Sequence, residues 1–170
     1  MLAIGDVILR AFNFIFLAIA LGLTGSLAAT TYTQHNPQIN FGVFAAAFGI
    51  LTSSLYGIFA FFISAFAWPV ILFVFDFLNF VFTFAAATAI AAGIRVHSCS
   101  NQDYLDDNNI TQGSSGRCRK AQASVAFLYF STFIFIASGI FSLIGLFKGG
   151  LFGSSSRSTP RTGVPSMSQV

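Results

Sequence analysis

The stretch PVILFVFDFLNFVFTFAAATAIAAGI, residues Pro69–Ile94, is the strongest indication of the fold of this chain. A helix that crosses a membrane needs about 20 predominantly apolar residues, because each residue adds about 1.5 Å and the hydrocarbon layer is about 30 Å thick. The stretch exceeds that length and contains a single ionisable side chain, Asp76. It therefore predicts a transmembrane helix.

Three further apolar runs reach the same length, and they are Ala11–Ala29, Phe41–Ile63 and Ala121–Phe147. A membrane β-barrel is excluded because its strands alternate in polarity and are about 10 residues long. The sequence predicts an all-α fold, an antiparallel bundle of four transmembrane helices over residues 1–148. The first run exceeds the apolar core of a signal peptide, and Asp6 weakens the positive start of such a peptide, so we expect it to stay in the protein.

The composition leaves no room for a separate soluble domain. Hydrophobic residues make up 55% of the chain and charged residues 8%, and 23 residues are Phe. Too few polar side chains remain to cover a water-exposed surface, so lipid must be the solvent for most of the protein. The eight basic residues lie beside the apolar runs and form no stripe of the kind that binds nucleic acid.

Four spans place both termini on one side of the membrane, and the loop between the third and fourth spans on the other. Basic residues are equally numerous on the two sides and give no orientation. Cys99 and Cys118 bracket this loop, which also contains Asn109 in a glycosylation triplet, Asn-Ile-Thr. Both features suit an extracytoplasmic space. The cysteines form a disulfide or remain two free thiols, and Asn109 carries a glycan or lies too close to the bilayer.

The segment 149–170 is rich in Gly, Ser, Thr and Pro. It cannot bury enough apolar area to fold, and we expect a disordered cytosolic tail. Ser156, Ser158 and Thr159 lie near arginines and are candidate phosphorylation sites, where added charge would weaken attraction to anionic lipid. The alternative is a flexible terminus without a regulatory role.

Small residues recur every four positions in the second apolar run, at Ala45, Gly49, Ser53 and Gly57. On a helix they form a narrow stripe that lets another backbone approach closely. The stripe packs either within one bundle or between two copies of the chain. Because lipid provides no hydrophobic drive for helix association, such faces also lead us to expect a homo-oligomer.

Asp76 lies well inside the third run, with Asn79 one helical turn further along the same face. Arg10 and Asn13 enter the membrane from the same side on the first run, so we predict a polar cluster of these four residues. The cluster either locks the helices together or forms a site that responds to lipid headgroups or protons. A small transporter or channel that uses Asp76 is the alternative function.

No arrangement of residues in the sequence predicts catalysis, a metal site or a bound cofactor. His35 and His97 lack carboxylates at metal-ligand spacing, and no glycine-rich loop leads into a phosphate-binding helix. We therefore expect a protein that is not an enzyme. A bound lipid or sterol remains compatible with the composition.

Several longer segments resemble one family. They are Ser54–Gly57, Ala67–Pro69, Asp76–Phe84, Gly93–Cys99, Ile110–Gly113, Arg117–Arg119 and Ala126–Phe130, together with the tail ends Gly163–Pro165 and Ser168–Val170. In these segments the chain is similar to the fungal non-classical export protein 2 family, which belongs to the MARVEL-domain tetraspans. The resemblance covers the chain from its first residues to its last.

This resemblance implies a multi-pass plasma-membrane protein with both termini in the cytosol. It further implies a location in eisosomes and their furrow-like microdomains, with eisosome coat proteins and sphingolipids or sterols as partners. Members of the family are associated with organising these domains, with responses to sphingolipid state and with export of proteins that lack signal peptides. From the residues and the resemblance together we expect a non-enzymatic membrane organiser.

Overall fold

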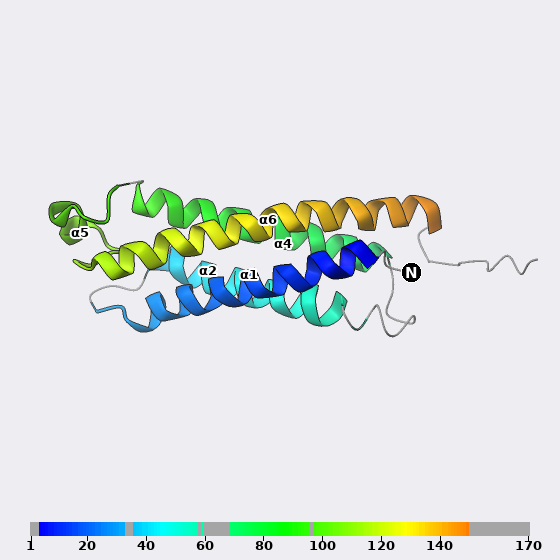
Figure 1. Cartoon of the computed structure of the whole chain (residues 1–170), viewed down its shortest axis with the longest axis horizontal. Helices are drawn as coiled ribbons and strands as arrows, with labels where there is room; N and C mark the ends of the chain where they lie inside the picture. The colour runs from blue at the N-terminus through cyan, green and yellow to red at the C-terminus, as the bar shows by residue number, and fades with distance from the viewer. Residues whose placement is uncertain (1–3, 33–35, 58, 60–68, 96, 150–170) are drawn as a thin grey trace, which may run out of the picture.

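Four long helices run along the length of the molecule in this computed structural model, which describes residues 4–32, 36–57, 59, 69–95 and 97–149. They are α1 (Ile4–Ala29), α2 (Pro37–Gly49) with its π-helical continuation η1 (Ile50–Leu55), α4 (Pro69–Ile94) and α6 (Ser115–Gly149). A short helix, α5 (Gln102–Asp107), lies at the end of the bundle opposite the N-terminus (Figure 1). The prediction of an all-α bundle is confirmed.

The helices pack as a ring in which each long helix contacts two neighbours. Helix α6 packs against α1 and α4, and α2 packs against the same two helices from the other side. The core between them is built from small and aliphatic side chains, among them Leu17, Ala46, Ala86 and Leu128, all fully buried. Small residues bring the helix backbones close together, which is the usual basis of association in lipid.

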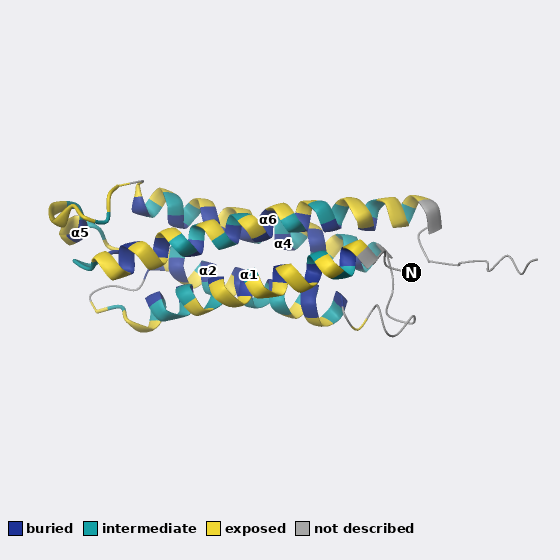
Figure 2. Cartoon of the chain, viewed as in Figure 1, coloured by how far each residue is buried: buried dark blue, intermediate teal, exposed yellow. Residues whose placement is uncertain are grey.

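The outer surface of the bundle is apolar. Exposed residues lie along the outer faces of all four long helices (Figure 2). The exposed large apolar side chains include Phe12, Phe77 and Phe133. A soluble protein would aggregate through such a surface. By length and apolar composition, four helices can span a membrane, and their spans are Gly5–Ala29, Pro37–Leu55, Val70–Ile94 and Ser115–Phe147. The chain is thus a multi-pass membrane protein.

Three of the four long helices begin earlier than predicted. Helix α1 begins at Ile4, well before Ala11, because charged residues in its first turns are buried in the core. Helix α2 begins at Pro37, since proline suits the first turn of a helix. Helix α6 begins at Ser115, and only α4 keeps both predicted ends. The predicted end of the second span, Ile63, and the tail residues 150–170 lie outside the described residues.

Candidate functional site

Arg10 is the centre of a buried network of charges near the N-terminal end of the bundle. Its spacing of four residues from Asp6 puts both side chains on one face of α1. The Nε atom of Arg10 donates to Oδ2 of Asp6 over 2.8 Å. Arg10 is 2% exposed and Asp6 is 1% exposed. The pair is therefore inside the bundle rather than at its surface.

The guanidinium of Arg10 also connects α1 to the other three long segments, to η1 and α4 directly and to α6 through Asp76. It donates to both carboxylate oxygens of Asp76 on α4, over 3.0 Å from Nη1 and 2.8 Å from Nη2. Nη1 lies 3.2 Å from the hydroxyl of Ser53 on η1. Ser142 on α6 donates to Oδ2 of Asp76 over 2.9 Å. One cation thus links all four membrane-spanning segments.

The geometry of this network is that of a paired buried charge. Two carboxylates face one guanidinium, and the contact with Asp76 is bidentate, the arrangement in which arginine binds carboxylates most strongly. Gly57 allows the close approach, because a Cβ atom at this position would lie 2.8 Å from Cδ of Arg10. Breaking such a pair leaves an uncompensated charge in a low-dielectric interior. We call Asp6, Arg10, Ser53, Asp76 and Ser142 the charge network.

Two of the four residues predicted to form the polar cluster lie outside the charge network. Asn79 donates to Oγ1 of Thr52 over 2.7 Å and to the carbonyl of Phe75 over 2.9 Å. Asn13 is fully buried, and its amide atoms make no hydrogen bond with the described residues. The structure therefore brings Arg10 and Asp76 together and leaves both asparagines without a bond to that pair.

Asp76 is not the only charged side chain buried in the bundle, although the predicted spans contain no other one. Asp6 and Arg10 are buried in α1, and Arg117 is 6% exposed in α6. Asp6 and Arg10 precede Ala11, the predicted start of the first span. The spacing of Asp6 and Arg10 was a usable signal, because a pair four residues apart on one helix can neutralise itself. The roles of Ser53 and Ser142 had no comparable signal, since they depend on how distant helices pack.

The small-residue stripe of the second span faces the interior of the same chain. Ala45 is fully buried, a Cβ at Gly49 would lie 2.9 Å from Cδ1 of Leu17, and Ser53 and Gly57 contact Arg10. A π-turn takes more residues than an α-turn because its hydrogen bonds run from i to i+5. The π-helical segment η1 therefore offsets the sideways drift of a four-residue repeat and keeps the stripe on one face.

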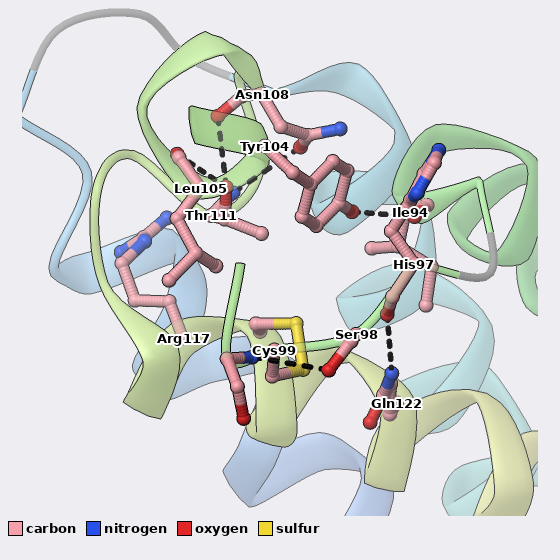
Figure 3. Close-up of a disulfide and its surroundings, with 12 residues drawn as sticks. Ile94, His97, Ser98, Cys99, Tyr104, Leu105, Asn108, Thr111, Arg117 and Gln122 are labelled. Carbon is pink, nitrogen blue, oxygen red and sulfur yellow. Dashed lines mark hydrogen bonds between the residues drawn. A yellow bond between two sulfur atoms is a disulfide. The ribbon is translucent and has the colours of Figure 1, made fainter. Parts of the chain in front are cut away.

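At the opposite end of the bundle, a disulfide joins Cys99 in the loop to Cys118 in α6, with 5.7 Å between their Cα atoms (Figure 3). Arg117 lies beside it and donates to backbone carbonyls. Its Nε bonds to Ile110 over 3.0 Å, and its Nη1 bonds to Thr30 over 2.7 Å and to Leu27 over 3.2 Å. Arg117 thus ties the loop and the start of α6 to the C-terminal end of α1.

The loop itself is held by polar contacts to the end of α4. The hydroxyl of Tyr104 donates to the carbonyl of Ile94 (Figure 3). The amide of Asn108 donates to the carbonyl of Gly93 over 2.8 Å. Burial raises the pKa of the Tyr104 phenol, so this donor stays protonated at neutral pH. The ring of His97 packs on that of Tyr104 with 4.7 Å between centroids.

The glycosylation triplet is divided between surface and interior. Asn109 is exposed, whereas Thr111 is fully buried and its hydroxyl donates to the carbonyl of Leu105 over 2.7 Å. The candidate phosphorylation sites Ser156, Ser158 and Thr159 lie outside the described residues, as does His35. Within the described residues, no three His, Cys, Asp or Glu side chains are grouped to hold a metal ion.

Comparisons with known proteins agree with this architecture. The model of the MARVEL family, described as a membrane-associating domain, matches residues 2–141. The chain is 88% identical to Non-classical export protein 102 of Candida albicans and 55% identical to Non-classical export protein 2 of Saccharomyces cerevisiae, each over the full length of both chains. It is 37% identical to a Schizosaccharomyces pombe homologue over 78% of this chain and 73% of that protein. No solved structure matches the chain.

Proposed function

The chain belongs to the MARVEL family of membrane-associating domains, and from this premise we propose that it is a non-enzymatic organiser of plasma-membrane microdomains. In this proposal the protein acts through its outer, lipid-facing surface and through contacts with other proteins. The four-helix core serves as a rigid support. Its relatives are named as non-classical export proteins, and we propose that this chain also contributes to the export of proteins that lack signal peptides.

The charge network is the observation that carries the proposal. Arg10 bonds to η1 and α4 from its place on α1, Asp76 extends the network to Ser142 on α6, and both oxygens of Asp76 already accept hydrogen bonds. A group that is fully engaged within the protein holds helices in one arrangement. A carboxylate that carries an ion or proton across a membrane needs a free side and a polar path. The geometry of the charge network therefore favours an organiser over a transporter or channel.

We propose that the loop between α4 and α6 lies on the extracytoplasmic side of the membrane. The disulfide between Cys99 and Cys118 suits an extracytoplasmic loop, since disulfides persist in oxidising compartments. With four spans, both termini are then cytosolic, where the tail can meet the coat proteins of eisosomes. Sphingolipid or sterol composition would bias the clustering of the protein by differential affinity for the clustered and dispersed states.

Fluorescence imaging of the tagged protein in a fungal plasma membrane tests this function. We expect stable cortical patches that disperse when sphingolipid synthesis is inhibited. Loss of the protein should disperse neighbouring patch proteins without stopping any solute flux. A uniform distribution that ignores sphingolipid synthesis would contradict the proposal. A flux across liposomes that disappears in an Asp76→Asn variant would also contradict it and favour a transporter.

We also propose that copies of the chain associate through α1. Ala18 and Gly22 lie on an exposed face of this helix, and a Cβ atom built at Gly22 or Gly25 meets no other atom within 4 Å. Close packing of a second helix fits such a face. Energy transfer between differently labelled copies should fall in a Gly22→Leu variant and stay unchanged in Ala126→Leu, which enlarges an exposed residue on α6. Equal transfer in both variants would overturn this interface.

A further inference from the structure

A cleft of about 550 Å³ lies at the loop end of the bundle, between the start of α2, the end of α4 and the short helix α5. The candidate spans Pro37–Leu55 and Val70–Ile94 begin and end beside it, so the cleft is at the level where hydrocarbon gives way to headgroups. The charge network lies at the other end of the bundle and shares no residue with this cleft.

Three charged side chains that line the cleft have no partner among the described residues, whereas Tyr104 and Asn108 in the same lining are hydrogen-bonded. Arg95, Asp103 and Asp107 line it, and their side chains make no hydrogen bond or ion pair with any described residue. Gln38 adds a buried carbonyl oxygen that lacks a partner among the described residues. One cation suits a phosphate, whereas two carboxylates repel it and accept hydrogen bonds from hydroxyl groups. This combination fits a phosphate that is joined to a ring of hydroxyls.

Arg95 occupies a backbone position that favours a different residue. It follows the last residue of α4 with φ of +48°, the left-handed conformation in which helices usually place Gly or Asn. An arginine there costs free energy that a glycine would not, and its side chain lines the cleft. This conformation ends α4 and places Arg95 in the lining of the cleft.

An aromatic wall lies below the cleft on the seam between α2 and α4. Phe82 of α4 packs against Phe44 and Phe48 of α2, with ring centroids 5.5 Å and 5.3 Å apart. Phe44 is 48% exposed toward the lipid. Ten residues of helix separate Gln38 from Phe48, and also Phe82 from Ala92, which is about 15 Å at 1.5 Å per residue. That length is about one leaflet, half of the hydrocarbon layer.

We propose that this seam binds a single lipid with a hydroxyl-rich phosphate headgroup, of the inositol phosphate type. The headgroup occupies the cleft, where Arg95 faces the phosphate and the carboxylate of Asp107 accepts hydrogen bonds from the hydroxyl groups. The acyl chains lie along Phe44, Phe48 and Phe82. The inference deepens the proposed function by naming a class of lipid that the protein recognises, and it rests on that function only in placing the site in the extracytoplasmic leaflet.

Native mass spectrometry of the purified full chain tests the site. The protein is equilibrated in phosphatidylcholine with equal amounts of phosphatidylinositol and phosphatidylglycerol, which carry the same charge but differ in their hydroxyl groups. We expect retained phosphatidylinositol to exceed phosphatidylglycerol at least fivefold. Equal retention would mean that charge alone attracts the lipids and would overturn the proposal. Competition by free inositol 1-phosphate at the concentration of the lipid would assign the cleft to a soluble polyol and would also overturn it.

Variants separate the cleft from the rest of the loop. Arg95→Asn should keep or raise the melting temperature, because Asn tolerates the left-handed conformation, yet reduce phosphatidylinositol retention toward that of phosphatidylglycerol. Asp107→Asn should have the same effect on retention. Asp106→Asn removes the same charge from the neighbouring position, which is not part of the cleft lining, and should leave retention unchanged. An undiminished preference in both cleft variants would overturn the site.

The outcome is independent of the cortical patch experiment. A protein that forms sphingolipid-dependent patches but shows no lipid preference would refute the headgroup site and leave the organiser function standing. A protein that prefers phosphatidylinositol but is uniformly distributed would support the site and refute the organiser function.

Discussion

The two ends of the bundle each bury an arginine, but they compensate its charge in different ways. Near the N-terminal end, Arg10 is matched by the carboxylates of Asp6 and Asp76. At the loop end, Arg117 has no carboxylate partner among the described residues and donates to backbone carbonyls. Carbonyls at the C-terminal end of α1 carry the negative end of the helix dipole, so they can hold a cation.

This difference shows what each end contributes. The charge network joins residues from all four spans inside the hydrocarbon region, so it fixes how the helices are arranged. The contacts of Arg117 join a loop to helix ends near the interface, where water can replace a lost partner, and the disulfide adds a covalent link. We therefore expect the core to depend on the charge network and the loop to depend on the disulfide and Arg117.

Replacing Arg10 should have the largest effect on stability. Arg10→Met leaves Asp6 and Asp76 buried without a cation and should lower the free energy of unfolding by about 3–5 kcal/mol. Unfolding by denaturant in lipid nanodiscs measures it. Arg119→Met makes the same chemical change at an exposed site of α6 and should shift stability by less than about 0.5 kcal/mol. Similar losses of stability in Arg10→Met and Arg119→Met would contradict the role of the charge network in holding the helices together.

Removing the disulfide should have the second-largest effect on stability. Its two cysteines are 19 residues apart, and the Cys99→Ser/Cys118→Ser variant should lose roughly 3 kcal/mol of stability in a chain-entropy model. Hydrogen exchange should then rise in residues 97–114 and remain slow in α1 and α4. Faster exchange around Arg10 instead would mean that the two ends are not independent.

Replacing Arg117 should cost less than replacing Arg10. Arg117→Met removes hydrogen bonds from a cation to carbonyls and should destabilise the protein by about 2 kcal/mol. The rate of proteolysis in the loop measures this loss and should rise in Arg117→Met. Lys120→Met removes one contact of an exposed ammonium, a 2.9 Å bond to Ser26, and serves as the control. A loss for Arg117→Met equal to that for Arg10→Met would contradict the distinction between the two ends.

The smallest predicted effect on stability distinguishes two buried asparagines of the core, Asn79 and Asn13. Asn79→Leu removes two hydrogen bonds, whereas Asn13→Leu removes none to the described residues. We expect Asn79→Leu to be the more destabilising of the two by about 1 kcal/mol, measured by the same denaturant unfolding. The opposite order would indicate that Asn13 has a role that its protein contacts do not explain.

The fold was predictable because it depends on the length and apolarity of continuous segments. The span Pro69–Ile94 was located to the residue, since proline marks its start and Arg95 its end. The start of α1 at Ile4 precedes the predicted Ala11, because apolarity alone ends a span at the first ionisable residue. Burial of Asp6 and Arg10 depends on their mutual neutralisation, which a count of apolar residues does not register. The π-helical segment at Ile50–Leu55 also has no signature in hydropathy.

The candidate site was predictable only in part. The approach of Arg10 to Asp76 followed from depth, because both residues lie at similar distances from the same side of the membrane. Depth in the membrane does not determine which polar residues on one helix face bond to Arg10. Asn79 donates to Thr52 and makes no bond to Arg10. Ser142 reaches Asp76 from a helix 66 residues later in the chain. Such contacts depend on helix rotation and packing, which a single sequence does not specify.

A double-mutant cycle between Arg10 and Asp76 measures whether this buried pair stabilises the packing of the four spans. The free energies of unfolding of the natural protein, Arg10→Met, Asp76→Asn and the double variant are measured in the same nanodiscs. If the pair locks the four spans together, the double variant will be more stable than the sum of the single losses predicts, by at least about 1.5 kcal/mol. Additive losses, within about 0.5 kcal/mol, would show that the two side chains do not stabilise each other and would contradict the account.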